Sequence, residues 1–444
     1  LSTTISLPRH WIRFVPVALW PLLQAYWKSK RLRFQTRADL ERHQAQQWQR
    51  FEQQVLAKSR YFQPFLGQPL LAWPLMNKAI MLQHFNSMNT VGMDLQAAFA
   101  VAQRAEQERD FAPTLNGISV GLSSGTSASR GVFVVSPAEQ ARWAGTILAK
   151  LLPQGLLSGE RVALVLRANN NLYESIDNRF IAFRFFDLLQ AFDDIAAQLQ
   201  AYRPSIIVAP AQVLRALALA QQQGRIDLQP KRVISAAEVL SDADRAIIET
   251  SFPELHQVYQ ATEGFLAVTC EHRRLHLNEE FLMVEQEWLD DTRYVPIITD
   301  FTRSSQPIIR YRLDDVLHHD DAPCPCGRVT RVIKRIEGRL NDVLRLPKHG
   351  APEQTVALFA DALERIIAQH LPMHADYQLT QTGVAALTLQ AQTDASGLHN
   401  LQAALQTYLD KQGVAVDALQ WDVSDTVTSD AMVVKRRRIK VQMA

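Results

Sequence analysis

Cysteine is scarce in this chain. Its 444 residues include only Cys270, Cys324 and Cys326. An odd number of cysteines, with no recognisable signal peptide, argues against the disulfide framework of a secreted protein and favours the reducing cytoplasm. The chain also has little excess charge, because lysine and arginine nearly balance aspartate and glutamate and leave a net charge of +2. This balance gives no electrostatic reason to expect nucleic acid as a partner.

Long apolar runs are absent as well. The apolar segment near the start, residues 11–27, is interrupted by Arg13, Pro16 and Pro21. No run reaches the roughly 18 to 20 residues needed to cross a bilayer. We expect this segment to pack on the body of the protein. The alternative is an interfacial anchor that gives peripheral contact with a membrane.

The length predicts a large domain and a smaller one, since it exceeds what one compact core usually holds. Apolar residues recur at near-helical intervals over 40–55, so residues 1–60 are expected to be largely helical. Short apolar runs at 162–166, 206–209 and 233–234 alternate with helical patterns. Strands buried on both faces and separated by helices predict a layered α/β domain with mainly parallel sheets.

The pattern changes after Asn341. A helix-like stripe from Val356 to Ile367, strand-like pieces around Gly383, a second helix over 398–409 and a strand at 419–423 predict a small α+β unit. We therefore expect a large domain over residues 1–340 and a small C-terminal domain over 341–444.

A polar loop stands between two strand-like segments, 118–120 and 132–135. It offers hydroxyls and backbone N–H groups, and its glycine lets phosphate oxygens approach the backbone. It is not a Walker loop, because no Gly-Lys-Ser/Thr follows at the required offset. The alternative is a simple polar turn. The loop residues are Ser123, Ser124, Gly125, Thr126 and Ser127.

The segment Tyr259-Gln260-Ala261-Thr262-Glu263 places an aromatic ring, a hydroxyl and a carboxylate close together. Tyr259 could flank adenine, and Glu263 could bind Mg²⁺, which prefers one or two carboxylates plus substrate phosphates. The alternative is a solvated glutamate beside a half-buried tyrosine.

Three further residues have side chains suited to a nucleotide. Asp315 could accept hydrogen bonds from both ribose hydroxyls, and Arg339 could reach ribose or phosphate. One lysine of the basic cluster over residues 433–440 could stabilise charge between a carboxylate and the α-phosphate. The alternatives are surface ion pairs for Asp315 and Arg339, and a basic tail that contacts RNA or membrane for the cluster.

Taken in order, these segments resemble the adenylate-forming superfamily of acyl- and aryl-CoA ligases, and most closely its phenylacetate–CoA ligase-like branch. Ser123 to Ser127 resembles the phosphate loop, Ala236-Ala237-Glu238 the adenine-side segment, Tyr259 to Glu263 the Tyr-x-x-Thr-Glu element, and Tyr311 to Val316 the ribose-binding segment. Residues 335–339 resemble the segment that leads into the family's hinge.

The resemblance implies a large N-terminal domain, a mobile C-terminal lid, ATP and Mg²⁺ as cofactors, and CoA or the phosphopantetheine of an acyl carrier protein as acceptor. It implies that Lys435, Thr262 and Glu263 are catalytic, with Lys440 as the second choice for the lysine. The sequence departs from the family where Arg130 replaces a lysine, Asn341 the acidic hinge residue, and Val434 a glycine.

The three cysteines and one histidine form a second pattern. Cys270 and His276, followed by Cys324 and Cys326, supply the thiolates and imidazole of a closed tetrahedral zinc site. Some proteins of the resembled branch carry zinc with similar spacing. The alternative is three reduced cysteines without metal, and His272 is the fallback nitrogen ligand.

We predict an enzyme that activates a small carboxylic acid, expected to be aromatic and hydroxybenzoate-like, to an acyl-adenylate and transfers it to a thiol. The competing hypothesis is a non-catalytic nucleotide-binding or peripheral-membrane protein that retains the fold.

Overall fold

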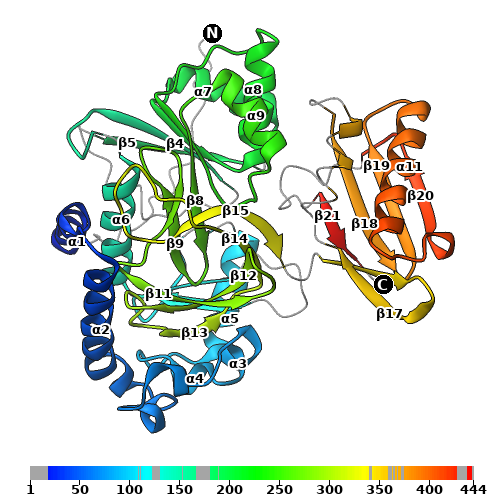
Figure 1. Ribbon diagram of the computed structural model, residues 1–444. Coiled ribbons are helices and arrows are strands. Elements are labelled where there is room, and N and C mark those ends of the chain that lie inside the picture. The colour runs from blue at the N-terminus through cyan, green and yellow to red at the C-terminus, as the bar shows by residue number, and fades with distance from the viewer. Residues whose placement is uncertain are drawn as a thin grey trace, which may run out of the picture.

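Helices form most of the first hundred residues that the computed structural model describes (Figure 1). They are α1 (Leu19–Arg31), α2 (Arg37–Gln54), α3 (Lys78–Gln83), α4 (Phe85–Met88) and α5 (Leu95–Glu108), with three short 3₁₀ turns at Leu56–Lys58, Gln63–Phe65 and Leu70–Ala72. α2 begins at a capping box in which Thr36 and Asp39 satisfy each other's backbone N–H groups. The described residues are 19–108, 110, 112–122, 131–152, 154–166, 181–188, 190–339, 343–358, 363, 366–367, 369–371, 375–427 and 438–442.

Five parallel strands form one half of the central sheet, in the order β5-β4-β6-β7-β8. They are β4 (Glu160–Leu166), β5 (Ile181–Asp187), β6 (Ile206–Ala209), β7 (Arg232–Ser235) and β8 (Leu255–Ala261). Helix α6 (Pro137–Leu151) packs on one face of this half. The other face is covered by α7 (Phe192–Tyr202), α8 (Ala211–Gln222) and α9 (Asp242–Ser251). The α/β class and the buried strands β4, β6 and β7 are as the apolar runs predicted.

Beyond β8 the sheet continues with antiparallel pairs. One strand, β13, lies off the main strand order and pairs with β12, also antiparallel. These strands are β9 (Gly264–Thr269), β10 (Leu275–Leu277), β11 (Leu282–Trp288), β12 (Arg293–Asp300), β13 (Ile308–Arg312), β14 (Asp315–Asp320) and β15 (Val332–Arg339). Among the described strands of this central sheet, parallel pairing is therefore limited to β4–β8. The physical reason is the connections: only Thr262 and Glu263 join β8 to β9, and so short a turn permits only an antiparallel pair. A separate three-stranded sheet holds β1 (Thr114–Leu115), β2 (Ile118–Leu122) and β3 (Val132–Val135).

Helix α1 packs on the back of α6. Leu22 and Tyr26 are buried there, and Gly145 of α6 allows the close approach, because a Cβ at this position would lie 2.2 Å from the Leu22 carbonyl oxygen. The expected packing thus holds for this side of α1. Its other side leaves Trp20 69% and Trp27 53% exposed. No helix within the described ranges is long and apolar enough to span a membrane.

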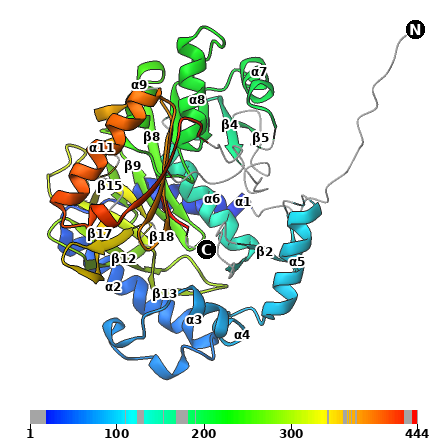
Figure 2. The ribbon, with the colours of Figure 1, turned by 90° about the vertical axis from the view of Figure 1, so that its right-hand side faces the viewer.

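The C-terminal part has its own sheet and core, and it lies to the right of the large body in Figure 1 and in front of it in Figure 2. The strands β16 (Leu344–Lys348) and β17 (Ala351–Leu358) form a hairpin. A four-stranded sheet follows, in the order β20-β19-β18-β21, and α11 (Ala395–Lys411) packs on it. Its strands are β18 (Tyr377–Gly383), β19 (Ala386–Ala391), β20 (Gln420–Ser424) and β21 (Ile439–Val441). The expected small α+β unit is therefore present, while the boundary at residue 341 lies outside the described residues and stays a prediction.

The helix expected from the stripe between Val356 and Ile367 is present in its later part. Leu363, Ile366 and Ile367 are helical, and Leu363 and Ile367 are buried in the core of this part. Val356 is the exception, because it lies in β17 and pairs with Leu346 of β16, so tertiary contact overrides the helical spacing at this position.

Candidate functional site

A cavity of about 480 Å³ opens where the parallel strands β7 and β8 end. Ligand sites of α/β sheets are commonly found beyond the carboxyl ends of such strands. Three separate segments that the sequence singled out contribute to its lining. The predicted residues found there are Ala236, Ala237, Glu238, Tyr259, Gln260, Thr262, Glu263 and Asp315.

Tyr259 and Asp315 are joined directly inside this cavity. The Tyr259 hydroxyl donates a hydrogen bond of 2.5 Å to Oδ2 of Asp315. Burial, and then the negative Asp315, raise the pKa of Tyr259 well above its usual value, so the phenol keeps its proton. Tyr259 therefore holds the Asp315 carboxylate in place, in addition to lining the cavity with its ring.

Glu263 is held by a second tyrosine. The Tyr311 hydroxyl hydrogen-bonds to it and, with Arg303, favours the ionised carboxylate, but burial and the nearby Asp315 outweigh them and raise the pKa of Glu263. A divalent cation would reverse this balance, because it favours ionised carboxylates. The Glu263 carboxylate therefore fits the role of holding Mg²⁺ against substrate phosphates.

The sequence analysis missed Arg303, which also lines the cavity. Only 6% of this residue is exposed, and its Nε and Nη2 atoms have no hydrogen-bond partner in the described part of the chain. Buried guanidinium groups are normally paired, so this one is suited to an anionic ligand. Arg303 follows β12 in a turn without a recognisable motif, and no spacing signal could have connected it with Glu263.

Several predicted residues cannot be placed. The loop Ser123 to Ser127, Arg130, Asn341 and Lys435 lie outside the described residues. The loop is flanked by β2 and β3, as expected, and Gly131 at its far end lines the cavity. Arg339 is described by its backbone, which pairs with Asp315 in the β14–β15 ladder. Lys440 lies in β21, opposite Thr380.

Arg438 connects the C-terminal part with the large body. Its guanidinium donates to both carboxylate oxygens of Asp244, at 2.7 and 2.9 Å, and to Ser241 at 3.1 Å. It also stacks on the ring of Tyr377, 5.2 Å from the centroid. Because Asp244 lies in the first turn of α9, Arg438, directly before β21, is fixed to this helix terminus.

The structure also brings the predicted metal ligands together. The ligand atoms of Cys270, His276, Cys324 and Cys326 all lie within 4.8 Å of one another. The Cys270 and Cys324 sulfurs are 3.6 Å apart, and the Cys326 sulfur is 3.4 Å from Nε2 of His276. Ligands of a tetrahedral zinc with Zn–S bonds of about 2.3 Å are about 3.8 Å apart, so the donor set fits this ion. The fallback His272 is not in the cluster.

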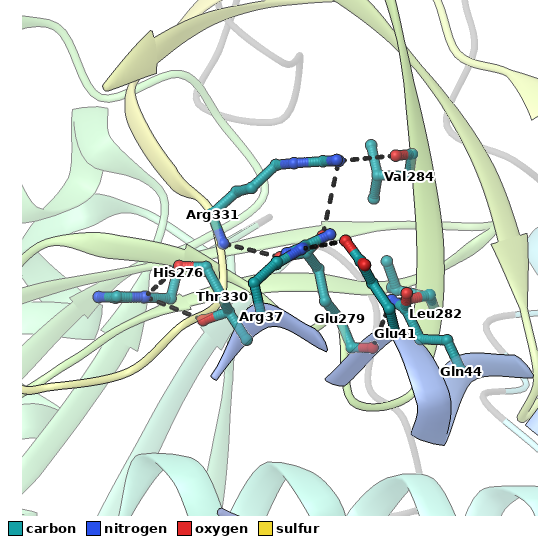
Figure 3. A network of polar contacts seen from close by, with 9 residues as sticks. All are labelled: Arg37, Glu41, Gln44, His276, Glu279, Leu282, Val284, Thr330 and Arg331. Carbon is teal, nitrogen blue, oxygen red and sulfur yellow. Dashed lines mark hydrogen bonds and ion pairs between the residues drawn. The ribbon is translucent and has the colours of Figure 1, made fainter. Parts of the chain in front are cut away.

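His276 is oriented by a neighbouring residue. Its Nδ1 lies 3.2 Å from the carbonyl oxygen and 3.0 Å from the hydroxyl of Thr330 (Figure 3). When Nδ1 carries the proton and donates it here, Nε2 is left as the metal ligand, an arrangement common in metal sites.

A buried carboxylate lies beside this histidine. Glu279 is fully buried and accepts from Arg37 of α2 at 2.6 and 2.8 Å and from the Arg331 backbone N–H at 2.7 Å (Figure 3). Gln44 of α2 donates to the carbonyl oxygens of Glu279 and Leu282. This network fixes α2 to the antiparallel half of the sheet.

Comparison with known proteins gives a similarity of fold. No family model matches the sequence, and no curated protein matches it. The structure is similar to 2-hydroxyisobutyryl-CoA ligase in the postadenylation state in complex with 2-HIB-AMP, with 15% identity, a TM-score of 0.59, and 99% of this chain and 94% of that chain covered. The chain has the fold of the adenylate-forming ligases.

The amide bond synthetase McbA from Marinactinospora thermotolerans is also similar. The identity is 12%, the TM-score is 0.51, and 72% of this chain and 68% of that chain are covered. The resemblance expected from the ordered motifs is thus confirmed at the level of the fold.

Proposed function

We propose that this protein activates a carboxylic acid with ATP and Mg²⁺ and transfers the acyl group to a thiol. The observation that carries the proposal is the convergence of Glu238, Glu263 and Asp315, from three distant segments, on one cavity of an adenylate-forming ligase fold. In this reaction a substrate carboxylate oxygen bonds to the α-phosphorus, the bond from that phosphorus to the bridging oxygen breaks, and pyrophosphate leaves with the electron pair.

Each described residue has a definite task in this reaction. Asp315, held by Tyr259, accepts from the ribose hydroxyls, and Glu263 holds the magnesium ion, which neutralises phosphate charge. Arg303 binds a carboxylate or phosphate oxygen. We assign Lys435 to the α-phosphate and the attacking carboxylate, on the basis of the sequence resemblance, and Thr262 to the phosphates.

In the second step a thiol attacks the acyl carbon and AMP leaves. The acceptor is the thiol of CoA or of a carrier protein's phosphopantetheine, and the basic residues of the C-terminal part suit either anionic partner. An aromatic, hydroxybenzoate-like acid is the expectation from the resemblance, and the test below includes it.

We also propose that Cys270, His276, Cys324 and Cys326 bind one structural Zn²⁺. The four ligands are all protein groups and none lines the cavity, so the ion would have no part in the reaction.

Acid-dependent exchange of labelled pyrophosphate into ATP tests the proposal. We expect exchange with at least one acid of a broad aryl and acyl panel. Lys435→Ala should reduce it by about 10²- to 10³-fold, as the loss of one transition-state donor does elsewhere, and a loss of this size in Lys440→Ala instead would give the role to the second-choice lysine. Folded protein that binds ATP but exchanges with no acid would favour the non-catalytic alternative.

A further inference from the structure

The cavity continues beyond Glu263 and Asp315 as a channel between α6 and the parallel strands. Its walls there are Val162, Leu164, Ile206 and Val208 from the sheet, and Ile147 and Leu151 from α6. All are apolar, and each belongs to the core cluster on this face of the sheet or packs against it.

The opposite face of the parallel sheet is packed by helices. Side chains alternate between faces, so Ala163 and Val165 point to the opposite side, where α7, α8 and α9 pack on them. Protein cores normally close to the density of organic crystals, without voids of this size. The open space on the α6 side therefore indicates a binding compartment.

The channel runs along the strands and not across them. Leu166, at the carboxyl end of β4, and Val162, four positions earlier, both line it. At a rise of about 3.3 Å per residue, these positions are about 13 Å apart. The compartment is thus deeper than a single aromatic ring requires.

One polar group stands among these walls. Nε1 of Trp143 in α6 is buried and has no hydrogen-bond partner among the described residues, and Trp143 lines the cavity. The other described side chains that α6 and β4 contribute to the lining are uncharged and apolar. A buried indole N–H usually has a partner, so a ligand oxygen at this level would satisfy it.

We propose that this channel holds the body of the acid that the enzyme activates. This inference rests on the proposed function and specifies its substrate class: a carboxylic acid with an uncharged, mainly apolar body about 13 Å long, with one hydrogen-bond acceptor within reach of Trp143. The carboxylate lies at the mouth, near Arg303 and Glu263, and the body extends along β4 toward Val162. A second charge on the part of the body between α6 and β4 is disfavoured, because the described side chains that these two elements contribute to the lining offer nothing to pair it.

The test is pyrophosphate exchange with straight-chain acids of increasing length, compared with benzoate, 4-hydroxybenzoate and dicarboxylic acids. Burial of each methylene should raise kcat/KM about fourfold until the channel is filled. Val162→Phe should shift the optimum to shorter acids and leave short acids unaffected. Val165→Ala, on the opposite face of the same strand, is the matched control and should keep the wild-type length profile.

A second measurement does not depend on turnover. A long-chain fluorescent acid should bind the nucleotide-free protein and be displaced by decanoate but not by succinate. Trp143→Phe should weaken the binding of only those acids that carry a hydrogen-bond acceptor on the body. If Val162→Phe does not fold, Leu151→Phe narrows the channel from the side of α6.

The outcomes separate this inference from the proposed function. Exchange with benzoates alone, with a profile that Val162→Phe leaves unchanged, would overturn the inference and leave acid activation intact. Exchange with no acid, in protein that binds ATP and the fluorescent acid, would overturn the proposed reaction. A loss of fluorescent-acid binding in Val162→Phe, but not in Val165→Ala, supports the channel in either case.

Discussion

The sequence predicted several residues that belong to the site, but it could not predict the hydrogen-bond partner of each. The spacing of Tyr259, Thr262 and Glu263 indicated a nucleotide site, and all three line the cavity. The hydrogen bond from Tyr259 to Asp315 could not be predicted, because it joins β8 to β14 through the folded sheet. Arg303 was missed for the same reason, since its position depends on where the turn after β12 meets the cavity.

A buried carboxyl near the site should make stability depend on pH. Asp300 accepts from the Thr302 N–H and hydroxyl, yet its complete burial raises its pKa to about 6. Below about pH 4 the Asp300 carboxyl is protonated in both the folded and the unfolded chain. Between about pH 4 and 6 it ionises first in the unfolded chain, so the folded state loses stability as the pH rises through this range.

Asp300→Asn should remove this dependence. We expect its unfolding free energy, relative to the wild type, to increase by up to about 3 kcal/mol between pH 4 and 7. Urea unfolding of both proteins across this range provides the measurement. Two parallel curves would show that Asp300 does not titrate as its burial requires.

At the scale of elements, the apolar runs predicted β4, β6 and β7, because strands buried on both faces leave a clear pattern. The stripe from Val356 to Ile367 predicted the helical residues Leu363, Ile366 and Ile367, but its start was wrong because pairing with β16 places Val356 in β17. Periodicity describes one element at a time, so it cannot reveal which partner an element finds.

The attachment of α2 offers a matched pair of substitutions. Glu279 and Glu41 both pair with Arg37, but the Glu279 side chain is fully buried and that of Glu41 is 59% exposed. Glu279→Gln should lower the free energy of unfolding by about 2 to 4 kcal/mol, because it leaves Arg37 and Arg331 without their buried partner. Glu41→Gln should cost less than about 0.5 kcal/mol. Chemical denaturation distinguishes the two, and equal losses would contradict the role of Glu279.

For the whole molecule, the metal cluster ties distant segments together. Cys270 follows β9, His276 lies in β10, and Cys324 and Cys326 lie between β14 and β15. Protein purified without added metal should contain about one equivalent of zinc. Cys324→Ser with Cys326→Ser should abolish it and lower the thermal midpoint, while ATP affinity is unchanged because the cluster lies outside the cavity lining. Metal-free protein with unchanged stability would exclude a structural ion.

The support that α1 gives to α6 has a consequence for how this protein could diversify. α6 forms one wall of the channel, and Gly145 brings α1 into close contact with its back. A methyl group at position 145 would push the helices apart or drive α6 inward. The width of the compartment is thus adjustable from the outer surface, so a change of substrate range need not begin with a residue that touches the substrate.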